Sequence, residues 1–325
     1  RRELYHHNTM SHLQILAGPL ALQRLRAEGL HAAQFRALLG ASGGPKWFVL
    51  YGLDRYLFGE FFRARTEPLY TLGSSAGAWR MCCLAMAQPV AAIDRLAERY
   101  SHEEYSEQPT IAEITDKARA MLQSVLGADG IHEIVTNPVF KTHLIADRCK
   151  GIGSSQSRAL QTITLGGAAL ANVISRKSLS LFFQRTVFST CSSDSPWANL
   201  QDIDTCQVRL TETNLGQAMM ASGSIPFVLA GERNIPGAPA GLYWDGGITD
   251  YHFDFPFHSG DELVLYPHFS PRVVPGWFDK HLPWRKPTAA NFDNVVLIAP
   301  SAEFVSQLPF GKIPDRTDFQ KFDIA

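Results

Sequence analysis

The sequence has little net charge. Its 325 residues contain 30 lysines and arginines against 31 aspartates and glutamates, which gives a formal net charge of −1. A chain this close to neutral has no overall field to draw it to nucleic acid or to an acidic membrane surface. We therefore expect no nucleic-acid partner, and any peripheral contact with a membrane has to come from a local patch.

Long apolar runs and paired cysteines are also missing. The apolar run at residues 13–22 is broken by Gly18 and Pro19, and no stretch reaches the roughly 18 apolar residues that span a bilayer. The five cysteines are an odd set without C-x-x-C spacing, which argues against a disulfide framework and a structural zinc site. We expect a soluble, cytoplasmic protein.

Internal repeats and low-complexity tracts are absent as well, which excludes solenoids and propellers. The length suits one α/β domain over residues 10–325. Residues 1–9 precede an internal methionine and contain His6 and His7. We interpret this segment as a tag or an upstream remnant, in preference to a metal site.

Strand and helix patterns alternate along the chain. Residues 34–39 read as a buried strand that enters a glycine cluster at 40–44 and a helix at 47–58, and residues 68–72 repeat this arrangement before a helix at 78–87. Further strands are predicted at 143–146, 186–190, 207–211, 242–244, 263–266 and 295–299, and further helices at 90–100, 111–126 and 216–221. The alternation predicts a three-layer α/β/α fold with a mostly parallel central sheet, in which reactive groups gather at the carboxyl ends of the strands.

The most informative motif is the Gly-x-Ser-x-Gly segment at residues 73–77, which carries Ser75. The motif is weak alone, but here it lies between an apolar strand and an apolar helix, the arrangement that exposes a nucleophilic hydroxyl on a sharp turn. The flanking glycines permit that turn, and the helix N-terminus favours developing negative charge. Ser74 occupies the position that points away from such a turn.

Gly43 and Gly44 end the preceding strand and are followed by Pro45 and Lys46. Two unhindered backbone N–H groups at this place suit the oxyanion of a tetrahedral intermediate. A phosphate-binding loop is excluded, because Pro45 stands where the loop needs glycine and Trp47 where it needs serine or threonine.

Asp245 follows a third apolar strand and precedes Gly246 and Gly247. Its carboxylate is a candidate base for Ser75, and the apolar residues before it suggest the burial that would raise its pKa. Taken alone, an Asp-Gly-Gly sequence is more often an ordinary turn.

Four segments of the chain resemble, in order and spacing, the motifs of the patatin-like phospholipase family. They are Gly-Ala-Ser-Gly-Gly-Pro-Lys at 40–46, Gly-Ser-Ser-Ala-Gly at 73–77, Ala-Ser-Gly-Ser-Ile-Pro at 221–226 and Asp-Gly-Gly at 245–247. The resemblance implies an α/β serine acyl hydrolase, acting on phospholipids or other glycerolipids, that uses a serine and aspartate dyad without a catalytic histidine, metal or organic cofactor. By this resemblance Ser75 is the nucleophile and Asp245 the base.

The same resemblance makes Gly43 and Gly44 the oxyanion donors and Lys46 a support of their loop, while Ser222 and Pro226 are scaffold. The first loop departs from the family pattern, because Ala41 and Ser42 replace an acidic residue and a glycine of an Asp-Gly-Gly-Gly run.

Two other functions stay open. An α/β-hydrolase triad would take Ser75, Asp245 and a late histidine from among His252, His258, His268 and His281. A noncatalytic lipid-binding protein with an eroded first loop is the alternative outside enzymes.

For contact with lipid, the segment at 275–286 mixes tryptophan, phenylalanine and basic side chains as an interfacial loop does. Residues 179–183 form a second apolar segment, for which burial is favoured. Arg80, one turn after Ser75, is a candidate for an anionic head group, although a salt bridge on the helix is the commoner role.

Overall fold

The computed structural model describes residues 11–155, 157–191, 194–257 and 262–318. The segment 1–9, interpreted above as a tag or remnant, and His258 lie outside these ranges. None of the helices in these ranges combines the length and the apolar character that a membrane span requires.

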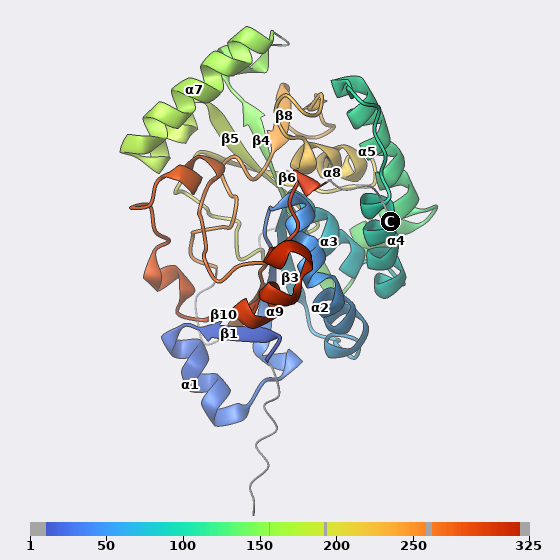
Figure 1. The fold of residues 1–325 in the computed structure, drawn as a ribbon, viewed down its shortest axis with the longest axis vertical. Helices are drawn as coiled ribbons and strands as arrows, with labels where there is room; N and C mark the ends of the chain where they lie inside the picture. The colour runs from blue at the N-terminus through green and yellow to red at the C-terminus, as the bar shows by residue number, and fades with distance from the viewer. Residues whose placement is uncertain (1–10, 156, 192–193, 258–261, 319–325) are drawn as a thin grey trace, which may run out of the picture.

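The described strands form one ten-stranded sheet in the order β1-β10-β9-β2-β3-β4-β5-β6, with β8 beside β4 and β7 beside β8 (Figure 1). The central strands β10, β9, β2, β3 and β4 are parallel, and the antiparallel pairs lie toward the edges and at β8. The predicted mostly parallel sheet is therefore confirmed. The strands are β1 Leu13–Ala17, β2 Phe35–Gly40, β3 Leu69–Ser74, β4 Phe140–Cys149, β5 Phe183–Ser189, β6 Thr205–Arg209, β7 Glu232–Arg233, β8 Leu242–Asp245, β9 Leu263–Pro267 and β10 Val295–Pro300.

The helices cover both faces of this sheet. They are α1 Pro19–Glu28, α2 Tyr51–Tyr56, α3 Ala76–Leu84, α4 Pro89–Ser101, α5 Ile111–Leu126, α6 Gly130–Thr136, α7 Arg158–Ile174, α8 Leu215–Gly223 and α9 Ala302–Gln307. Figure 1 shows α7 on one side of the strands and α4 and α5 on the other. The expected three-layer arrangement is confirmed.

Two cores follow from the alternation of side chains along each strand. Leu38 of β2 points into a core shared with α3, α4, α5 and α8, whereas Ala37 and Leu39 point into a core filled by Phe253, Phe255 and other aromatic side chains of the chain after β8. The central strands are apolar along their whole length because their side chains are buried on both faces of the sheet.

Some elements differ from the sequence prediction. The expected helix at 47–58 is a 3₁₀ helix, η2 (Gly44–Leu50), followed by α2 and one wide turn, Leu57–Phe61. Helix α7 was not predicted, because after Arg158 it contains no charged residue and so lacks the usual polar stripe.

Candidate active site

The register of β4 brings Ser75 and Asp245 together. One edge of β4 pairs with β5 along residues 143–149. The other edge pairs with β3 up to Ser74 opposite Ile145, and then with β8 from Asp245 opposite Ala146. Strands β3 and β8 thus point their carboxyl ends at each other along one edge of β4. The expectation that Asp245 ends a strand of the parallel sheet needs one correction, since β8 is antiparallel to β4.

Ser75 occupies the turn between β3 and α3. Its backbone has φ 56° and ψ −128°, a region that side chains with a Cβ rarely adopt and that persists only where the surroundings enforce it. The Ser222 hydroxyl accepts a hydrogen bond from the Ser75 N–H at 3.0 Å and donates one to the Ile145 carbonyl at 2.6 Å. Ser222, expected as scaffold, lies where it holds this turn in place.

The glycines around Ser75 are required by close backbone approach. A Cβ on Gly77 would overlap the carbonyl of Gly40, and a Cβ on Gly73 would overlap the backbone of Ala78. At Gly40 and Gly77 the backbones of strand β2 and helix α3 therefore touch each other directly. This contact sets the first loop directly beside the serine turn.

The side chain of Ser75 points at Asp245. Its Oγ donates a hydrogen bond to Asp245 Oδ2 at 2.7 Å, while the Gly247 N–H donates to Asp245 Oδ1 at 2.7 Å. Both side chains are buried. Burial raises the pKa of Asp245, and the hydrogen bonds from Ser75 and Gly247 oppose that rise only in part. A buried carboxylate that accepts a hydrogen bond from a serine hydroxyl is a pairing that can serve as a nucleophile and its base.

The first loop presents two free backbone donors. The Ser42 N–H is used, because it donates to the Tyr251 carbonyl at 3.0 Å. Within the described chain, the N–H groups of Gly43 and Gly44 have no acceptor. Gly44 has φ +55°, and a Cβ on Gly43 would overlap the Phe269 ring, so both positions favour glycine.

The remaining serine of the motif does not face the site. Ser74 is fully buried, and its hydroxyl lies 2.9 Å from the Ser42 hydroxyl. This bond ties β3 to the first loop. It also gives the nonglycine residue Ser42 a structural role in that loop.

Lys46 lies next to this loop, as expected, with its Nζ 5.3 Å from the centre of the Phe269 ring. Burial lowers its pKa. Sequence reasoning missed two further cations, Lys280 and Arg316, whose charges act on Asp245 and lower its pKa. They follow Asp245 by 35 and 71 positions and carry no motif, so no local signal could have identified them.

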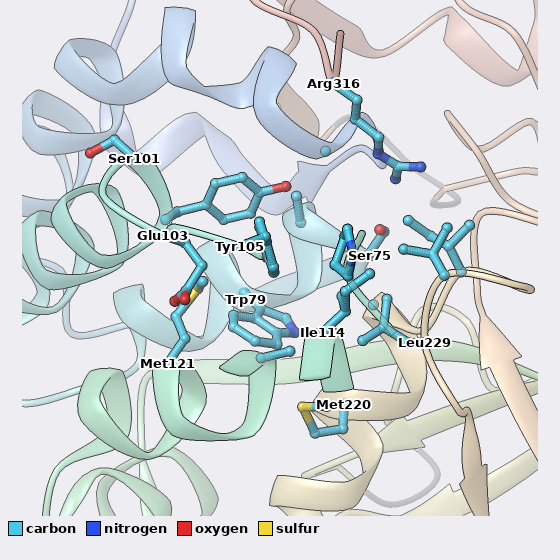
Figure 2. A pocket seen from close by; sticks show the side chains of 18 of the residues that line it. Ser75, Trp79, Ser101, Glu103, Tyr105, Ile114, Met121, Met220, Leu229 and Arg316 are labelled. Atoms are coloured by element: carbon cyan, nitrogen blue, oxygen red, sulfur yellow. The ribbon is translucent and has the colours of Figure 1, made fainter. Parts of the chain in front are cut away.

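A pocket of about 1230 Å³ opens at Ser75 (Figure 2). Its wall is largely apolar and comes from α3, α4, α5 and α8, and includes Trp79, Leu96, Ile114, Met121, Met220 and Leu229. Glu103, Glu104 and Glu107 line it as well, and in Figure 2 Glu103 lies on the opposite side of the pocket from Arg316. The apolar part of this lining suits a hydrophobic ligand group.

Sequence comparison does not assign this chain to a family. No protein-family model and no curated protein matches its sequence. Among solved structures, VipD from Legionella pneumophila is similar at 11% identity and a TM-score of 0.35, over 72% of this chain and 50% of VipD. The chain thus spans half the length of that neighbour. At this level the likeness carries no weight for function, which is inferred below from the site itself.

The described histidines do not complete a triad. The Ser75 hydroxyl is hydrogen-bonded to Asp245, the Ser75 N–H to the Ser222 hydroxyl, and the Asp245 carboxylate also to the Gly247 N–H. None of the described histidines forms a hydrogen bond with the side chain of Ser75 or Asp245. His252 and His268 are buried side by side, with ring centres 4.3 Å apart, and desolvation lowers the pKa of both. His281 is exposed.

The residues expected to meet lipid divide into buried and exposed ones. Arg80 is buried and forms a two-pronged ion pair with Asp54 at 2.6 and 2.7 Å, so it cannot reach a head group. In the segment 179–183, for which burial was favoured, Leu179 and Phe183 are buried but Leu181 is 73% exposed. Trp277 and Trp284 are exposed. Within the described ranges, no cluster of three or more metal-ligating side chains could hold a metal ion.

Proposed function

We propose that this chain is a serine acyl-ester hydrolase of the lipid acyl hydrolase type, with Ser75 as nucleophile and Asp245 as its base, in one domain over residues 10–325. The observation that carries the proposal is the 2.7 Å hydrogen bond from the Ser75 hydroxyl to the buried Asp245 carboxylate at the mouth of a largely apolar pocket.

In the proposed reaction Ser75 Oγ attacks the ester carbonyl carbon as its proton passes to Asp245 Oδ2. The N–H groups of Gly43 and Gly44 donate to the resulting oxyanion, each worth about 3 kcal/mol of transition-state stabilisation. Asp245 then gives the proton to the departing alkoxide, which leaves an acyl-enzyme on Ser75. Asp245 then takes a proton from water as the water oxygen attacks this ester, and it gives that proton to Ser75 Oγ as the bond to the acyl group breaks, which releases the fatty acid and restores the serine hydroxyl.

Several features of the site support a lipid ester as substrate. The pocket wall beside Ser75 is rich in aromatic, leucine and methionine side chains, which bind acyl chains by the hydrophobic effect. The order of motifs that resembles patatin-like phospholipases points to the same class. The alternatives are a triad esterase, for which a histidine beside Asp245 would be needed, and a noncatalytic lipid-binding protein.

The test is release of free fatty acid from p-nitrophenyl esters and phospholipids in the presence of EDTA, with Ser75→Ala as the matched variant. We expect hydrolysis by the natural chain and none by the variant. A fluorophosphonate probe should label the natural chain at Ser75. Folded protein that neither hydrolyses any ester nor takes the label would favour the noncatalytic alternative.

A histidine scan separates the two enzyme alternatives. We expect replacement of His252, His258, His268 and His281 by asparagine, one at a time, to leave turnover within about tenfold of the natural chain. Loss of nearly all turnover at one of them, in a protein that stays folded, would favour the triad.

A further inference from the structure

Three cations lie around the dyad without a carboxylate of their own. Within the described residues Lys46, Lys280 and Arg316 form no ion pair with any aspartate or glutamate. Lys280 Nζ instead lies 3.8 Å from the centre of the Tyr251 ring and 5.6 Å from that of Trp277. The nearby Asp315 is already bonded to Lys312.

These side chains converge on the first loop and on Asp245. The Arg316 guanidinium lies against Gly44, about 3.4 Å from where a Cβ would be, and lines the pocket together with Ser75. Figure 2 shows it on the Ser75 side of the pocket. Burial, and to a smaller extent the charges of Lys46 and Arg316, lower the pKa of Lys280 to about 8. Like charges gathered at a partly buried place repel one another unless an anion joins them.

We propose that Arg316, Lys280 and Lys46 form a subsite for an anionic group, a phosphate or a carboxylate, on the ester substrate next to its scissile bond. The inference rests on the proposed function. Arg316 offers the two-pronged donor set that such groups bind best, with the two lysines as supporting point charges. The carboxylates at the other end of the pocket, such as Glu103, place the anion at the Ser75 end.

The test compares two short-chain esters with the same acyl group, a lysophosphatidic acid and the neutral monoacylglycerol. We expect the ratio of their kcat/KM values to favour the anionic ester and to fall about tenfold or more in Arg316→Gln and in Lys280→Gln. Arg26→Gln on the distant helix α1 is the matched loss of one charge, and its ratio should equal that of the natural chain.

The outcomes separate this inference from the proposed function. Hydrolysis of both esters with a ratio that the substitutions do not change would overturn the subsite and leave the hydrolase standing. No hydrolysis of either ester would overturn the function itself. Inorganic phosphate should inhibit hydrolysis of the anionic ester by the natural chain. If phosphate inhibits but the enzyme shows no preference for the anionic ester, the three cations bind free phosphate and the inference is overturned.

A separate observation concerns the outer face of α7. Ile163, Leu170 and Ile174 lie on one side of this helix and are 60%, 75% and 88% exposed. After Arg158 the helix has no charged residue. An apolar face of this size on a soluble chain marks an interaction surface.

The charge around α7 indicates its partner. From Arg148 to Ser193 the sequence contains six basic residues and no aspartate or glutamate. Three of the six, Lys150, Arg176 and Arg185, form ion pairs with aspartates from other parts of the chain. Arg158 and Lys177, at the two ends of the helix, form no ion pair in the described part of the chain. Basic residues at the ends of an uncharged apolar face match an anionic lipid surface.

Two segments that contact α7 carry further groups suited to lipid. The η6 segment (Trp277–His281) is tied to α7 by a 2.7 Å hydrogen bond from Asn172 to Asp279, and it carries the exposed Trp277. Tryptophan favours the boundary between water and lipid. At the other end of α7, Arg158 lies over the ring of Phe227, which lines the pocket. Arg158 thus links the first turn of α7 to a residue of the pocket wall.

We infer that this α7 face docks on the surface of an anionic lipid bilayer. The test uses the Ser75→Ala chain, so that binding is measured without hydrolysis, in co-sedimentation with phosphatidylcholine vesicles with and without phosphatidylserine. We expect tighter binding to the anionic vesicles, and about tenfold or more weaker binding after Leu170→Glu with Ile174→Glu. Leu22→Glu on α1 is the control and should bind like its parent.

Two results would overturn the docking surface. One is vesicle binding that the α7 substitutions do not change. The other is a parent chain that binds no vesicles, is dimeric by light scattering and becomes monomeric after the α7 substitutions. In that case the α7 face is the contact between two copies of the chain. Unchanged thermal unfolding of the variant ensures that lost binding reports on the surface.

Discussion

Replacing Asp245 with asparagine tests the dyad most directly. Asparagine has nearly the same shape, and its Oδ1 can still accept the hydrogen bond that the Gly247 N–H donates at 2.7 Å. Its amide nitrogen cannot take a proton from the Ser75 hydroxyl. The substitution therefore removes the base and leaves the hydrogen-bonded frame.

The expected loss of activity follows from this single change. A positioned general base contributes about 10²- to 10⁴-fold to the rate, and a decade corresponds to about 1.36 kcal/mol. We expect kcat/KM to fall by that range, which is a loss of about 3 to 5.5 kcal/mol of transition-state stabilisation. The oxyanion donors and the pocket stay in place and sustain the residual rate.

Stability should change in the opposite direction. Burial raises the pKa of Asp245 above its unfolded value, so the folded state binds a proton more tightly than the unfolded state. The contribution of this group to stability is then greatest below its unfolded pKa and is lost as the pH rises through the folded pKa. Because asparagine does not titrate, Asp245→Asn should unfold at an equal or higher temperature than the natural chain at pH 8.

The same pKa predicts the pH dependence of activity. The natural chain should lose kcat/KM as the pH falls through a single value above the ordinary aspartate pKa of about 3.9, because Asp245 must be ionised. The assay is hydrolysis of a soluble ester between pH 4 and pH 9, with thermal melts at each pH. Activity of Asp245→Asn above one tenth of the natural chain, or a kcat/KM that does not fall as the pH is lowered from 9 to 4 while the protein stays folded, would refute the reasoning.

Three further substitutions test the frame, each measured by urea unfolding. Ser222→Ala strands the Ser75 N–H and the Ile145 carbonyl, so it should cost about 1–3 kcal/mol of stability and lower turnover; an unchanged protein would show that Ser222 does not hold the turn. Gly77→Ala should cost about 1–3 kcal/mol of stability or more, because its Cβ would overlap the neighbouring strand. The control is Gly52→Ala, whose Cβ would meet no atom and which should be neutral or stabilising by up to about 1 kcal/mol. Equal effects of the two substitutions would contradict the close approach. Arg80→Met leaves the Asp54 carboxylate buried without a partner and should cost about 3–5 kcal/mol, a loss that adding Asp54→Leu should largely recover; a single variant as stable as the natural chain would show that the pair is dispensable.

The sequence alone determined the local parts of the site. Strand, turn and helix around Ser75 follow from apolar spacing and from glycines within a few residues, and the structure has β3 and α3 where these patterns predict them. Helix α5 begins and ends at the predicted residues, 111 and 126, because its amphipathic pattern and its Thr110 cap are local too.

Only the tertiary structure decided which groups meet. Ser75 and Asp245 are 170 positions apart, and their contact depends on two strands sharing one edge of β4, a pairing that no local pattern encodes. The positions of Arg316 and Lys280 beside the dyad, and the exposure of the α7 face, depend likewise on how distant segments pack. Hydrophobic periodicity predicts which side of a helix or strand is buried. Which other element covers that side, or whether any does, depends on the fold as a whole.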